Sequence, residues 1–296
     1  MINRLAILGV GLIGGSLARV LRRAGACGTI TGYGRSEAHL QRARELGVID
    51  HYSLAAGAAV RDADLVVLAT PLATNEPLLL EIRADLKEDA VITDVGSVKG
   101  SVVAAARRSL SARQLAGFVP GHPIAGTEKS GVEASFAGLF ENHLVILTPL
   151  QETDAASLKI VSDMWQAAAA RVVTMEVEHH DAVLAATSHL PHMLAYALVD
   201  CLAGMQESDE IFKYAAGGFA DFTRIASSPP AMWHDICYAN RENVLRILNL
   251  FDCHLKKIQQ AIESENSSAL LEVFTRAKES RDNFARQRSG TINAPE

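Results

Sequence analysis

The sequence predicts an α/β protein: a doubly wound parallel sheet in an N-terminal domain, residues 1–175, and an all-helical C-terminal domain, residues 176–296. Short continuous apolar runs alternate with helical patterns over the first part, as buried parallel strands alternate with helices. Past about residue 176 the strand-like runs cease and long helical patterns follow. A glycine-rich turn also follows the first apolar run, where such sheets bind nucleotides.

The elements follow one another in a regular order. Strands are expected at residues 5–8, 29–33, 64–71, 90–96, 118–122, 143–148 and 171–175. Helices are expected at residues 36–46, 75–86, 97–110 and 155–170, after a first helix that follows the glycine turn. The C-terminal domain is expected to hold a helix at 178–205, two short helices in 209–226, and long helices at 230–263 and 264–288. The apolar character of residues 178–205 predicts a helix buried on several sides.

Composition and charge exclude several classes of protein. The formal net charge of −6 argues against nucleic acid or an anionic membrane surface as the main partner. We find no run of about 18 uncharged apolar residues, so we expect no transmembrane helix. The first residues lead straight into a strand, which leaves no room for a signal peptide. Four cysteines without a CxxC pair are typical of reduced thiols. A cytoplasmic globular protein is therefore expected.

The glycine turn has the spacing G-x-G-x-x-G of a dinucleotide-binding fingerprint. Gly9 permits the tight turn, Gly11 lets the backbone approach a pyrophosphate, and Gly14 lets the helix pack against the strand. The helix that starts at Leu12 and Ile13 offers free N–H groups to the phosphates. The motif predicts an N-terminal Rossmann domain, the alternative being a purely structural turn.

The choice of cofactor is predicted from the end of the second strand. An acidic residue is common there, where it binds the ribose hydroxyls of NAD, but this sequence reads Gly34-Arg35-Ser36. Arginine and a hydroxyl favour a 2′-phosphate, so NADP is preferred over NAD. In the alternative, Arg35 is solvated, Ser36 only caps the next helix, and either cofactor binds. Thr70 and Pro71 end another strand and are further candidates for cofactor binding.

His122 is the candidate catalytic base. It follows a strand end, and a neutral imidazole there can take a proton from an alcohol as hydride leaves. Ser97, at a neighbouring strand end, is placed to hydrogen-bond the same hydroxyl or the imidazole. A loop histidine that only satisfies backbone groups is an equally weighted alternative for His122.

Two histidines in the C-terminal domain share a helix face. His189 and His192 are three residues apart, and Pro191 between them is expected to kink the helix. The pair is compatible with substrate binding, with buried structural histidines, or with a metal site assisted by His179, His180 or Asp181. No convincing ligand set stands at standard spacing, so no metal is predicted.

Arg224 lies in an otherwise apolar helical stretch, where a cation needs an anionic partner. A substrate carboxylate would serve, and pairing with Asp221 is the structural alternative. Met232, Trp233 and Phe222 are expected to wall an apolar pocket or to pack in the core.

The stretches together resemble the prephenate/arogenate (cyclohexadienyl) dehydrogenase family of tyrosine biosynthesis. The motifs that carry the resemblance are GVGLIGGS at 9–16, ATPL at 69–72, DVGSVKG at 94–100, GHPIAGTEKSG at 121–131, SHLPH at 188–192 and GGFADFTRIASSPPAMW at 217–233. The resemblance implies a Rossmann domain, a helical dimerisation domain and therefore a homodimer. It also implies hydride transfer to NAD(P)+ with loss of CO2, which gives 4-hydroxyphenylpyruvate from prephenate or tyrosine from arogenate.

The resemblance also assigns roles to residues. It implies that His122 accepts the hydrogen bond of the ring hydroxyl and that Ser97 orients this pair. It implies that Arg224 holds a substrate carboxylate and that His192, with His189, lines the substrate site. Two further residues match positions near the entrance or the side-chain end of the substrate, Glu128 and Trp233. Glu128 is a candidate for favouring the amino group of arogenate.

Two rival functions are weighed against this one. Another two-domain hydroxyacid dehydrogenase would need a lysine in the helical domain, and the early part of that domain offers Lys213 without a matching motif. A nucleotide-sensing regulator without turnover would keep the glycine turn but would not need His122, Ser97 and Arg224 together.

Overall fold

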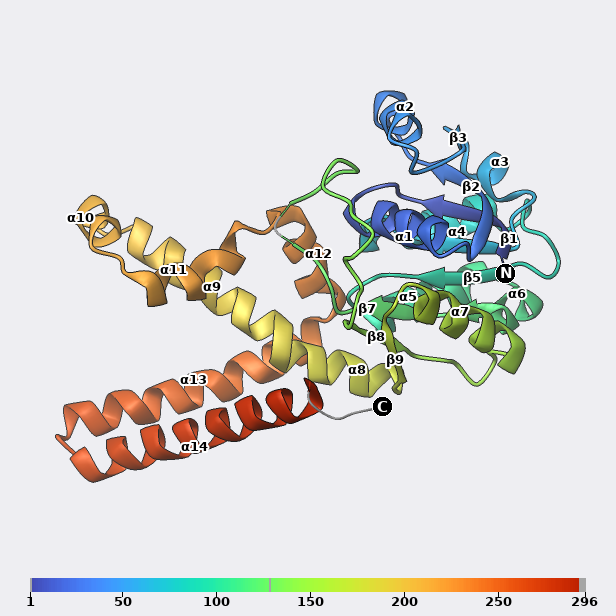
Figure 1. Ribbon diagram of the computed structural model, residues 1–296. Coiled ribbons are helices and arrows are strands. Elements are labelled where there is room, and N and C mark those ends of the chain that lie inside the picture. The colour runs from blue at the N-terminus through green and yellow to red at the C-terminus, as the bar shows by residue number, and fades with distance from the viewer. Residues whose placement is uncertain (1, 128, 293–296) are drawn as a thin grey trace. The chain divides into compact units, whose positions relative to one another are not determined.

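The computed structural model describes residues 2–127 and 129–292, and in this part of the chain it confirms the predicted fold class. A parallel sheet runs in the strand order β3-β2-β1-β4-β5-β6 (Figure 1). Its strands are β1 (Ile2–Leu8), β2 (Cys27–Tyr33), β3 (His51–Ser53), β4 (Leu65–Leu68), β5 (Val91–Asp94) and β6 (Phe118–Val119). The order changes direction between β1 and β4, so the carboxyl ends of these strands form the crevice in which such sheets bind ligands.

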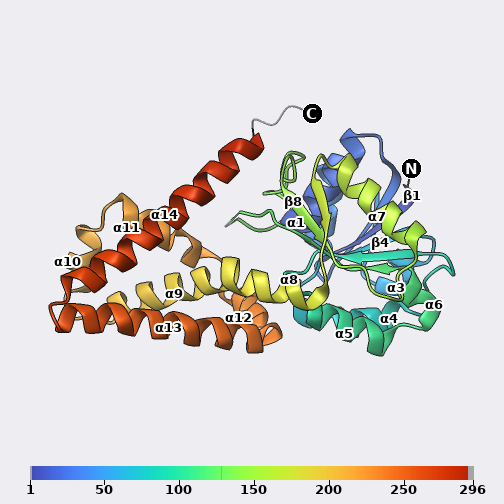
Figure 2. The same ribbon diagram turned by 90° about the horizontal axis from the view of Figure 1, so that it is seen from below.

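Helices cover both faces of the sheet because successive strand residues point to opposite sides. Leu5 and Ile7 of β1 join one core cluster, whereas Ala6 and Leu8 join the other. The first face is covered by α1 (Leu12–Arg23), α2 (Glu37–Glu45) and α7 (Ala155–Ala167). The second is covered by α3 (Ala56–Val60), α4 (Asn75–Ile82), α5 (Lys99–Ser109) and α6 (Ala112–Ala116). Figure 2 shows α1 and α7 on one side of the strands and α4 and α5 on the other.

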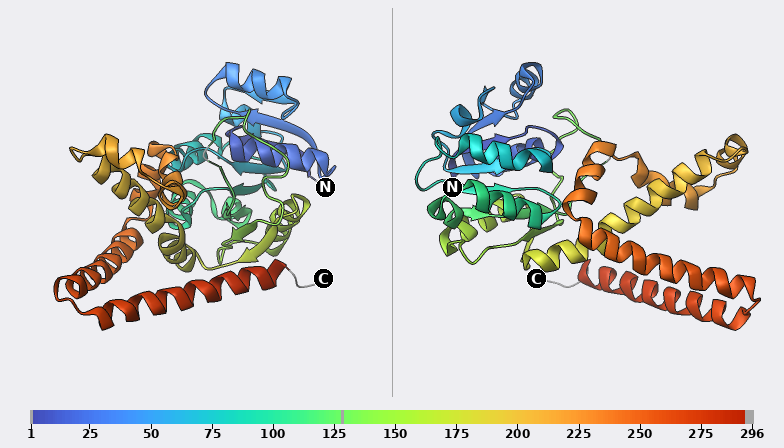
Figure 3. Two further views of the ribbon diagram at one scale, coloured as in Figure 1. Left: turned by 60° about the vertical axis from the view of Figure 1, so that its left-hand side comes forward. Right: turned by 180° about the vertical axis from the view of Figure 1, so that it is seen from behind.

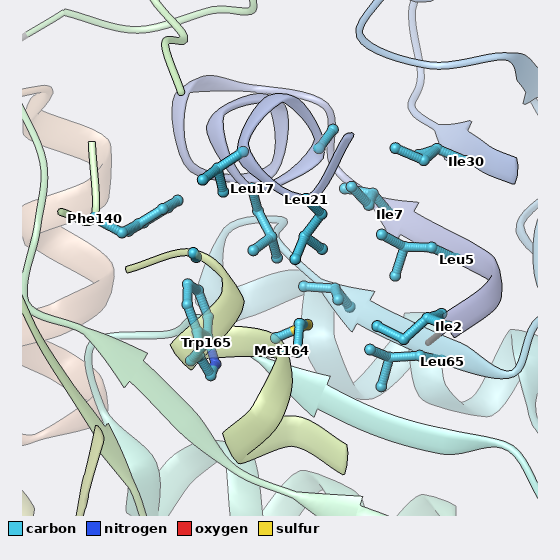
Figure 4. Packing of buried hydrophobic residues seen from close by; sticks show 14 of the residues in the cluster. Ile2, Leu5, Ile7, Leu17, Leu21, Ile30, Leu65, Phe140, Met164 and Trp165 are labelled. Carbon is cyan, nitrogen blue, oxygen red and sulfur yellow. The ribbon is translucent and has the colours of Figure 1, made fainter. Parts of the chain in front are cut away.

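The larger core lies between α1, α7 and the sheet. Figure 4 shows Leu17 and Leu21 of α1 facing Met164 and Trp165 of α7 within one cluster. Trp165 is fully buried and meets Phe140 edge to face, with ring centroids 5.1 Å apart. Edge-to-face contact is a favoured geometry for aromatic pairs, so this pair helps to hold α7 in place.

A second, smaller sheet was not predicted as a separate unit. Residues 118–122 were expected as one strand, but they divide into β6 and β7 (Gly121–Pro123). Pro120 stands between them and has no N–H to continue the ladder. β7 pairs antiparallel with β8 (Leu144–Leu147), and β8 pairs parallel with β9 (Arg171–Thr174). The division places His122 in a strand rather than in a loop.

The helical part begins with one long interrupted helix. It consists of α8 (Val177–Leu184), a π-helical turn η2 (Ala185–His189) and α9 (Leu190–Ala203). Pro191 cannot donate a helical hydrogen bond, which accounts for a break in the ladder just before it. The remaining elements are α10 (Ser208–Lys213), α11 (Gly217–Thr223), η3 (Arg224–Ser227), α12 (Pro230–Ala239), α13 (Arg241–Glu263) and α14 (Ser267–Ile292). The helix expected over 230–263 is therefore interrupted at Asn240.

The chain divides by its contacts into two compact units, one extending to Val244 and the other beginning at Leu245. The first helices belong with the sheets because α8 packs on α5, and α12 packs on the short helix η1 (Leu72–Thr74). The second unit consists of most of α13 together with α14. The two helices diverge from the turn that joins them (Figures 2 and 3).

One expectation about residues 177–203 is wrong and another stays a prediction. The segment is long and apolar enough to cross a membrane by length and composition alone, a test that core helices of globular proteins also pass, so the expectation of no transmembrane helix is not contradicted. The expectation of a helix buried on several sides is wrong for the single chain, since Ala195 is the one buried residue of α9. Its apolar surface is left for other contacts.

Candidate active site

A cavity of about 750 Å³ lies at the carboxyl ends of the sheet strands. It is lined by seven of the residues predicted to bind cofactor: Gly9, Gly11, Gly34, Arg35, Ser36, Thr70 and Pro71. Leu12, Ile13 and Gly14 do not line it. His39, which the sequence analysis did not single out, lies at the Arg35 end of the wall.

The fingerprint glycines are required by space and by backbone conformation. Gly9 has φ +106°, and a Cβ there would stand 2.5 Å from the carbonyl oxygen of Ala69. At Gly14 a Cβ would stand 2.2 Å from the oxygen of Gly9, so this glycine allows α1 to pack on β1. Gly11 has nothing within 4 Å of the position of a Cβ, which leaves its backbone open to the cavity.

The cavity fits a dinucleotide. Gly11 is the N-cap of α1 and has no side chain to cap the helix, and the first turn of α1 carries no acidic residue. The free N–H groups and the positive end of the helix dipole therefore suit a pyrophosphate. The buried hydroxyl of Thr70 has no hydrogen-bond partner among the described residues, as expected of a group that waits for a ligand.

Residues at the end of β2 lie where the ribose of the adenosine half is expected. Arg35 and Ser36 both line the cavity. Ser36 also caps α2, because its Oγ accepts the N–H of His39 at 3.4 Å. The capping role that the sequence offered as an alternative is thus present in a residue that also lines the cavity.

A buried ion pair joins the end of β5 to the start of β7. Asp94, the last residue of β5, accepts hydrogen bonds from the N–H groups of Gly96 at 2.7 Å and Gly121 at 3.1 Å. Lys99 is completely buried and donates to Asp94 and, at 2.5 Å, to the carbonyl oxygen of Gly121. A buried lysine must be paired and fully hydrogen-bonded, so this cluster fixes the backbone next to His122.

His122 is held from the helical side of the site. Its Nδ1 lies 2.9 Å from Nε2 of His180, and Nδ1 of His180 lies 2.8 Å from Oδ1 of Asp181. From the sequence, His180 and Asp181 were expected at most to assist a metal site. His180 and Asp181 lie 58 or more positions from His122 in the sequence, so sequence spacing did not predict this contact.

Ser97 stands between β5 and α5 and is partly buried. Ser97 was predicted to hydrogen-bond either the substrate hydroxyl or the imidazole of His122. Nδ1 of that imidazole contacts His180 instead. A role of Ser97 toward the substrate hydroxyl stays a prediction.

The two histidines of the SHLPH motif meet at Trp233. The ring of His192 stacks on the indole, with centroids 3.7 Å apart, and His189 meets it edge to face at 6.0 Å. Asn240 supports this group: its Nδ2 lies 3.2 Å from Nδ1 of His189 and donates to the carbonyl oxygen of Asp181 at 2.8 Å. Nε2 of His189 and Nε1 of Trp233 are buried without a partner among the described residues. These two nitrogens therefore keep unused hydrogen-bonding capacity.

Burial and neighbouring charge keep the site histidines neutral. Burial lowers the pKa of His122 well below 6.5, and the positive charge of Lys99 lowers this pKa further. Burial also lowers the pKa of His189 to about 4. Burial lowers the pKa of His192, the hydrogen bond with the carbonyl oxygen of Ser188 partly offsets this, and the positive charge of Arg224 lowers it again. At neutral pH these imidazoles are uncharged, and His122 is able to accept a proton.

The substrate-side residues are placed only in part. Arg224 is exposed at the end of α11, and its positive charge contributes to the lowered pKa of His192. Glu128 lies outside the described residues. Among residues 2–127 and 129–292, no group of three or more His, Cys, Asp and Glu residues is arranged to hold a metal ion.

Comparison with known proteins accounts for both halves of the chain. Residues 17–174 match the nucleotide-binding domain of prephenate dehydrogenase, and residues 176–276 match its dimerization domain. The chain belongs to the prephenate dehydrogenase family. The family resemblance drawn from the sequence is confirmed, and so is a nucleotide-binding domain followed by a mostly helical dimerization domain.

Individual members of the family cover nearly the whole chain. The cyclohexadienyl dehydrogenase of Zymomonas mobilis is 40% identical over 281 residues, which are 94% of this chain and 95% of that protein. The prephenate dehydrogenase of Bacillus subtilis is 37% identical over 296 residues, 99% of this chain and 79% of that protein.

Solved structures agree with this assignment. Prephenate dehydrogenase from Aquifex aeolicus, in complex with hydroxyphenyl propionate and NAD+, has a TM-score of 0.89 at 41% identity, and the match covers 96% of this chain and 99% of that one. Arogenate dehydrogenase from Synechocystis has a TM-score of 0.80 at 27% identity, with 95% and 99% covered.

Proposed function

We propose that His122 is the base that takes the hydroxyl proton when this chain oxidises its cyclohexadienol substrate. Family membership makes the chain an NAD(P)-dependent prephenate/arogenate (cyclohexadienyl) dehydrogenase of tyrosine biosynthesis. The observation that supports His122 is the contact of its Nδ1 with Nε2 of His180 at 2.9 Å, in a buried setting that lowers the pKa of the imidazole well below 6.5. Such a group is poised to accept a proton at neutral pH.

The reaction balances with one base. When bound, NAD(P)+ would accept the hydride that leaves the ring carbon bearing the hydroxyl. His122 takes the hydroxyl proton as that hydride leaves, and the oxygen becomes a carbonyl. The bond to the ring carboxylate then breaks, its electrons flow to the oxygen as the ring becomes aromatic, and CO2 departs. His122 returns its proton to the phenolate oxygen, so the imidazole ends the cycle neutral.

Positive charge and flat rings would hold the substrate. Prephenate carries two carboxylates and arogenate carries two carboxylates and an amine, so Arg224 is assigned to one carboxylate. His189, His192 and Trp233 offer nitrogens and ring surface on the same side of the site. Ser97 is assigned to the substrate hydroxyl. Glu128 is assigned to the side-chain end, where an amino group distinguishes arogenate from prephenate.

NADP is the cofactor we assign to the cavity at the end of β2. The relative from Aquifex aeolicus was solved with NAD+. In this chain, Arg35 and Ser36 line the corresponding wall together with His39, and all three suit a 2′-phosphate.

The test is a steady-state assay of nicotinamide reduction with prephenate and arogenate, each crossed with NAD and NADP. We expect reduction with at least one substrate, one CO2 released per reduced cofactor, and a higher kcat/KM with NADP than with NAD. Reduction with none of the four pairs would overturn the assignment, and faster turnover with NAD would overturn the cofactor preference alone.

A further inference from the structure

A chain of hydrogen bonds runs from His122 through His180 to the carboxylate of Asp181. Nδ1 of His122 meets Nε2 of His180 at 2.9 Å, and Nδ1 of His180 meets Oδ1 of Asp181 at 2.8 Å. The two imidazoles meet edge to face, with an interplanar angle of 65°. Neither His180 nor Asp181 has a role assigned in the reaction described above.

The carboxylate end of this chain of hydrogen bonds is fixed. Asp181 accepts the backbone N–H groups of Lys99 and Gly100, at the N-terminus of α5, at 2.8 Å each. Burial alone would raise the pKa of Asp181, but the hydrogen bonds from His180, Lys99 and Gly100 outweigh it and lower the pKa. Asp181 is therefore an ionised group that can only accept hydrogen bonds.

That restriction determines where the protons lie. Because Asp181 only accepts, Nδ1 of His180 carries hydrogen. In a neutral His180, Nε2 is then the acceptor, so Nδ1 of His122 carries the hydrogen between the two rings. The remaining nitrogen of His122, Nε2, keeps its lone pair. A protonated His180 would reverse this order and leave His122 with hydrogen on Nε2, unable to act as a base there.

We propose that His180 and Asp181 are positioning residues that hold His122 in its Nδ1–H tautomer, so that Nε2 faces the substrate as the base. This inference rests on the proposed role of His122. When Nε2 takes the substrate proton, the positive charge is shared along the Nδ1–H···Nε2 bond with His180, next to the negative charge of Asp181. The carboxylate stabilises the cation that forms, as it does in other histidine–carboxylate pairs.

The surroundings suit such a chain of hydrogen bonds. The side chain of His180 is completely buried, and Asp181 is nearly so. The backbone of Asp181 is also held, since Asn240 donates to its carbonyl oxygen at 2.8 Å. The other charged or titratable groups that face His122 and His180 are Lys99, paired with Asp94, and His189. In a dry, fixed setting of this kind a hydrogen bond determines the tautomer more strongly than it does in water.

The first test measures the tautomer in the unaltered protein. The full chain is labelled with ¹⁵N-histidine, and the His122 signals are identified by their loss in His122→Asn. We expect the NMR shifts of a protonated Nδ1 and an unprotonated Nε2 at pH 7.5. A protonated Nε2 with an unprotonated Nδ1 overturns the proposal, whether or not any variant folds.

The second test removes the acceptor and then restores it. In His180→Leu, kcat should fall about 10²–10⁴-fold with little change in KM, and His122 should lose its exclusive Nδ1–H signal. In His180→Gln the side-chain oxygen can accept from His122 while the amide donates to Asp181, so kcat should recover at least about tenfold. His179→Leu, on the exposed side of α8, is the matched control and should retain the activity of the parent chain.

The two proposals fail separately. An active His122→Asn removes His122 from the reaction and the proposed function with it. An inactive His122→Asn together with a fully active His180→Leu leaves that function standing and overturns the positioning role.

Discussion

His122 owes its chemistry to its position between two parts of the chain. β7 brings it from the sheet side, beside the buried pair of Asp94 and Lys99, and α8 brings His180 to its Nδ1. Burial and the positive charge of Lys99 keep the imidazole neutral, and the contact with His180 fixes its orientation.

Replacing this imidazole should remove the base and leave the cofactor cavity intact. For His122→Asn we expect kcat to fall about 10²–10⁴-fold, the usual contribution of a positioned base. Cofactor affinity, measured by isothermal titration calorimetry, should stay unchanged because His122 does not line the cavity. Full turnover by this variant would contradict the assigned role.

The pH profile should reflect the lowered pKa of His122. The base works only when neutral, so kcat/KM is lost as the pH falls through that pKa. Since burial and Lys99 hold the pKa below 6.5, we expect activity to remain level from pH 8 down through 6.5 and to decline only in more acidic buffer. A decline centred at or above 6.5 would show that the base is not in this environment.

Arg224 should act on substrate binding more than on turnover. In Arg224→Ala we expect KM for the substrate to rise about 10- to 100-fold, because a charge-assisted hydrogen bond to a carboxylate is lost. Asp221→Ala is the comparison. An unchanged KM in Arg224→Ala, with stability lost in both variants, would favour the structural pairing of these two residues.

Site residues that stand in short motifs could be predicted from the sequence, whereas those that meet across long sequence separations could not. His122, His189, His192 and Trp233 stand in short, recognisable stretches. His180 is 58 positions from His122, and Asp181 is 82 positions from Lys99, so only the folded chain brings them together. Similarly, Asn240 follows a helix of ordinary composition, and nothing near it signals a contact with His189, 51 positions away.

At the scale of elements, strong periodicity was easy to interpret and short segments were not. β1, β4 and β5 each contain an apolar run, and all three were predicted within a few residues. β3 is only His51–Ser53, an edge strand with polar ends, and no pattern of three residues distinguishes a strand from a loop. The break between α12 and α13 was missed because the apolar periodicity continues across Asn240.

The connection from β2 to α2 is the element that should decide cofactor choice. In Arg35→Gln we expect KM for NADP to rise about tenfold or more while KM for NAD stays within twofold, because only the 2′-phosphate loses a charged partner. NAD thus serves as the internal control. Equal effects on both cofactors would place Arg35 against a group that the two share, such as the pyrophosphate.

At the scale of the whole molecule, the helices present more apolar surface than one chain covers. Leu250 and Leu255 of α13 and Leu271 and Phe274 of α14 are each more than half exposed. Exposed apolar surface of this extent is typical of a protein–protein interface. Because these helices match a dimerization domain, we expect the interface to join two copies of this chain.

We therefore expect sedimentation to show a dimer at micromolar concentration. The double substitution Leu271→Glu with Phe274→Glu should weaken the dimer by placing charge on its apolar surface, whereas Glu272→Gln, on the same helix, should leave it intact. A monomeric parent chain would contradict this expectation.

Because His192 stacks on Trp233, the fluorescence of this tryptophan can report on substrate binding. The chain has two tryptophans, and the other, Trp165, is sealed in the sheet core. Because the imidazole is stacked on the indole, we expect the emission of Trp233 to change when substrate binds beside His192. In Trp165→Phe all tryptophan fluorescence would come from position 233, so occupancy of the substrate side could be followed without turnover, probe or label.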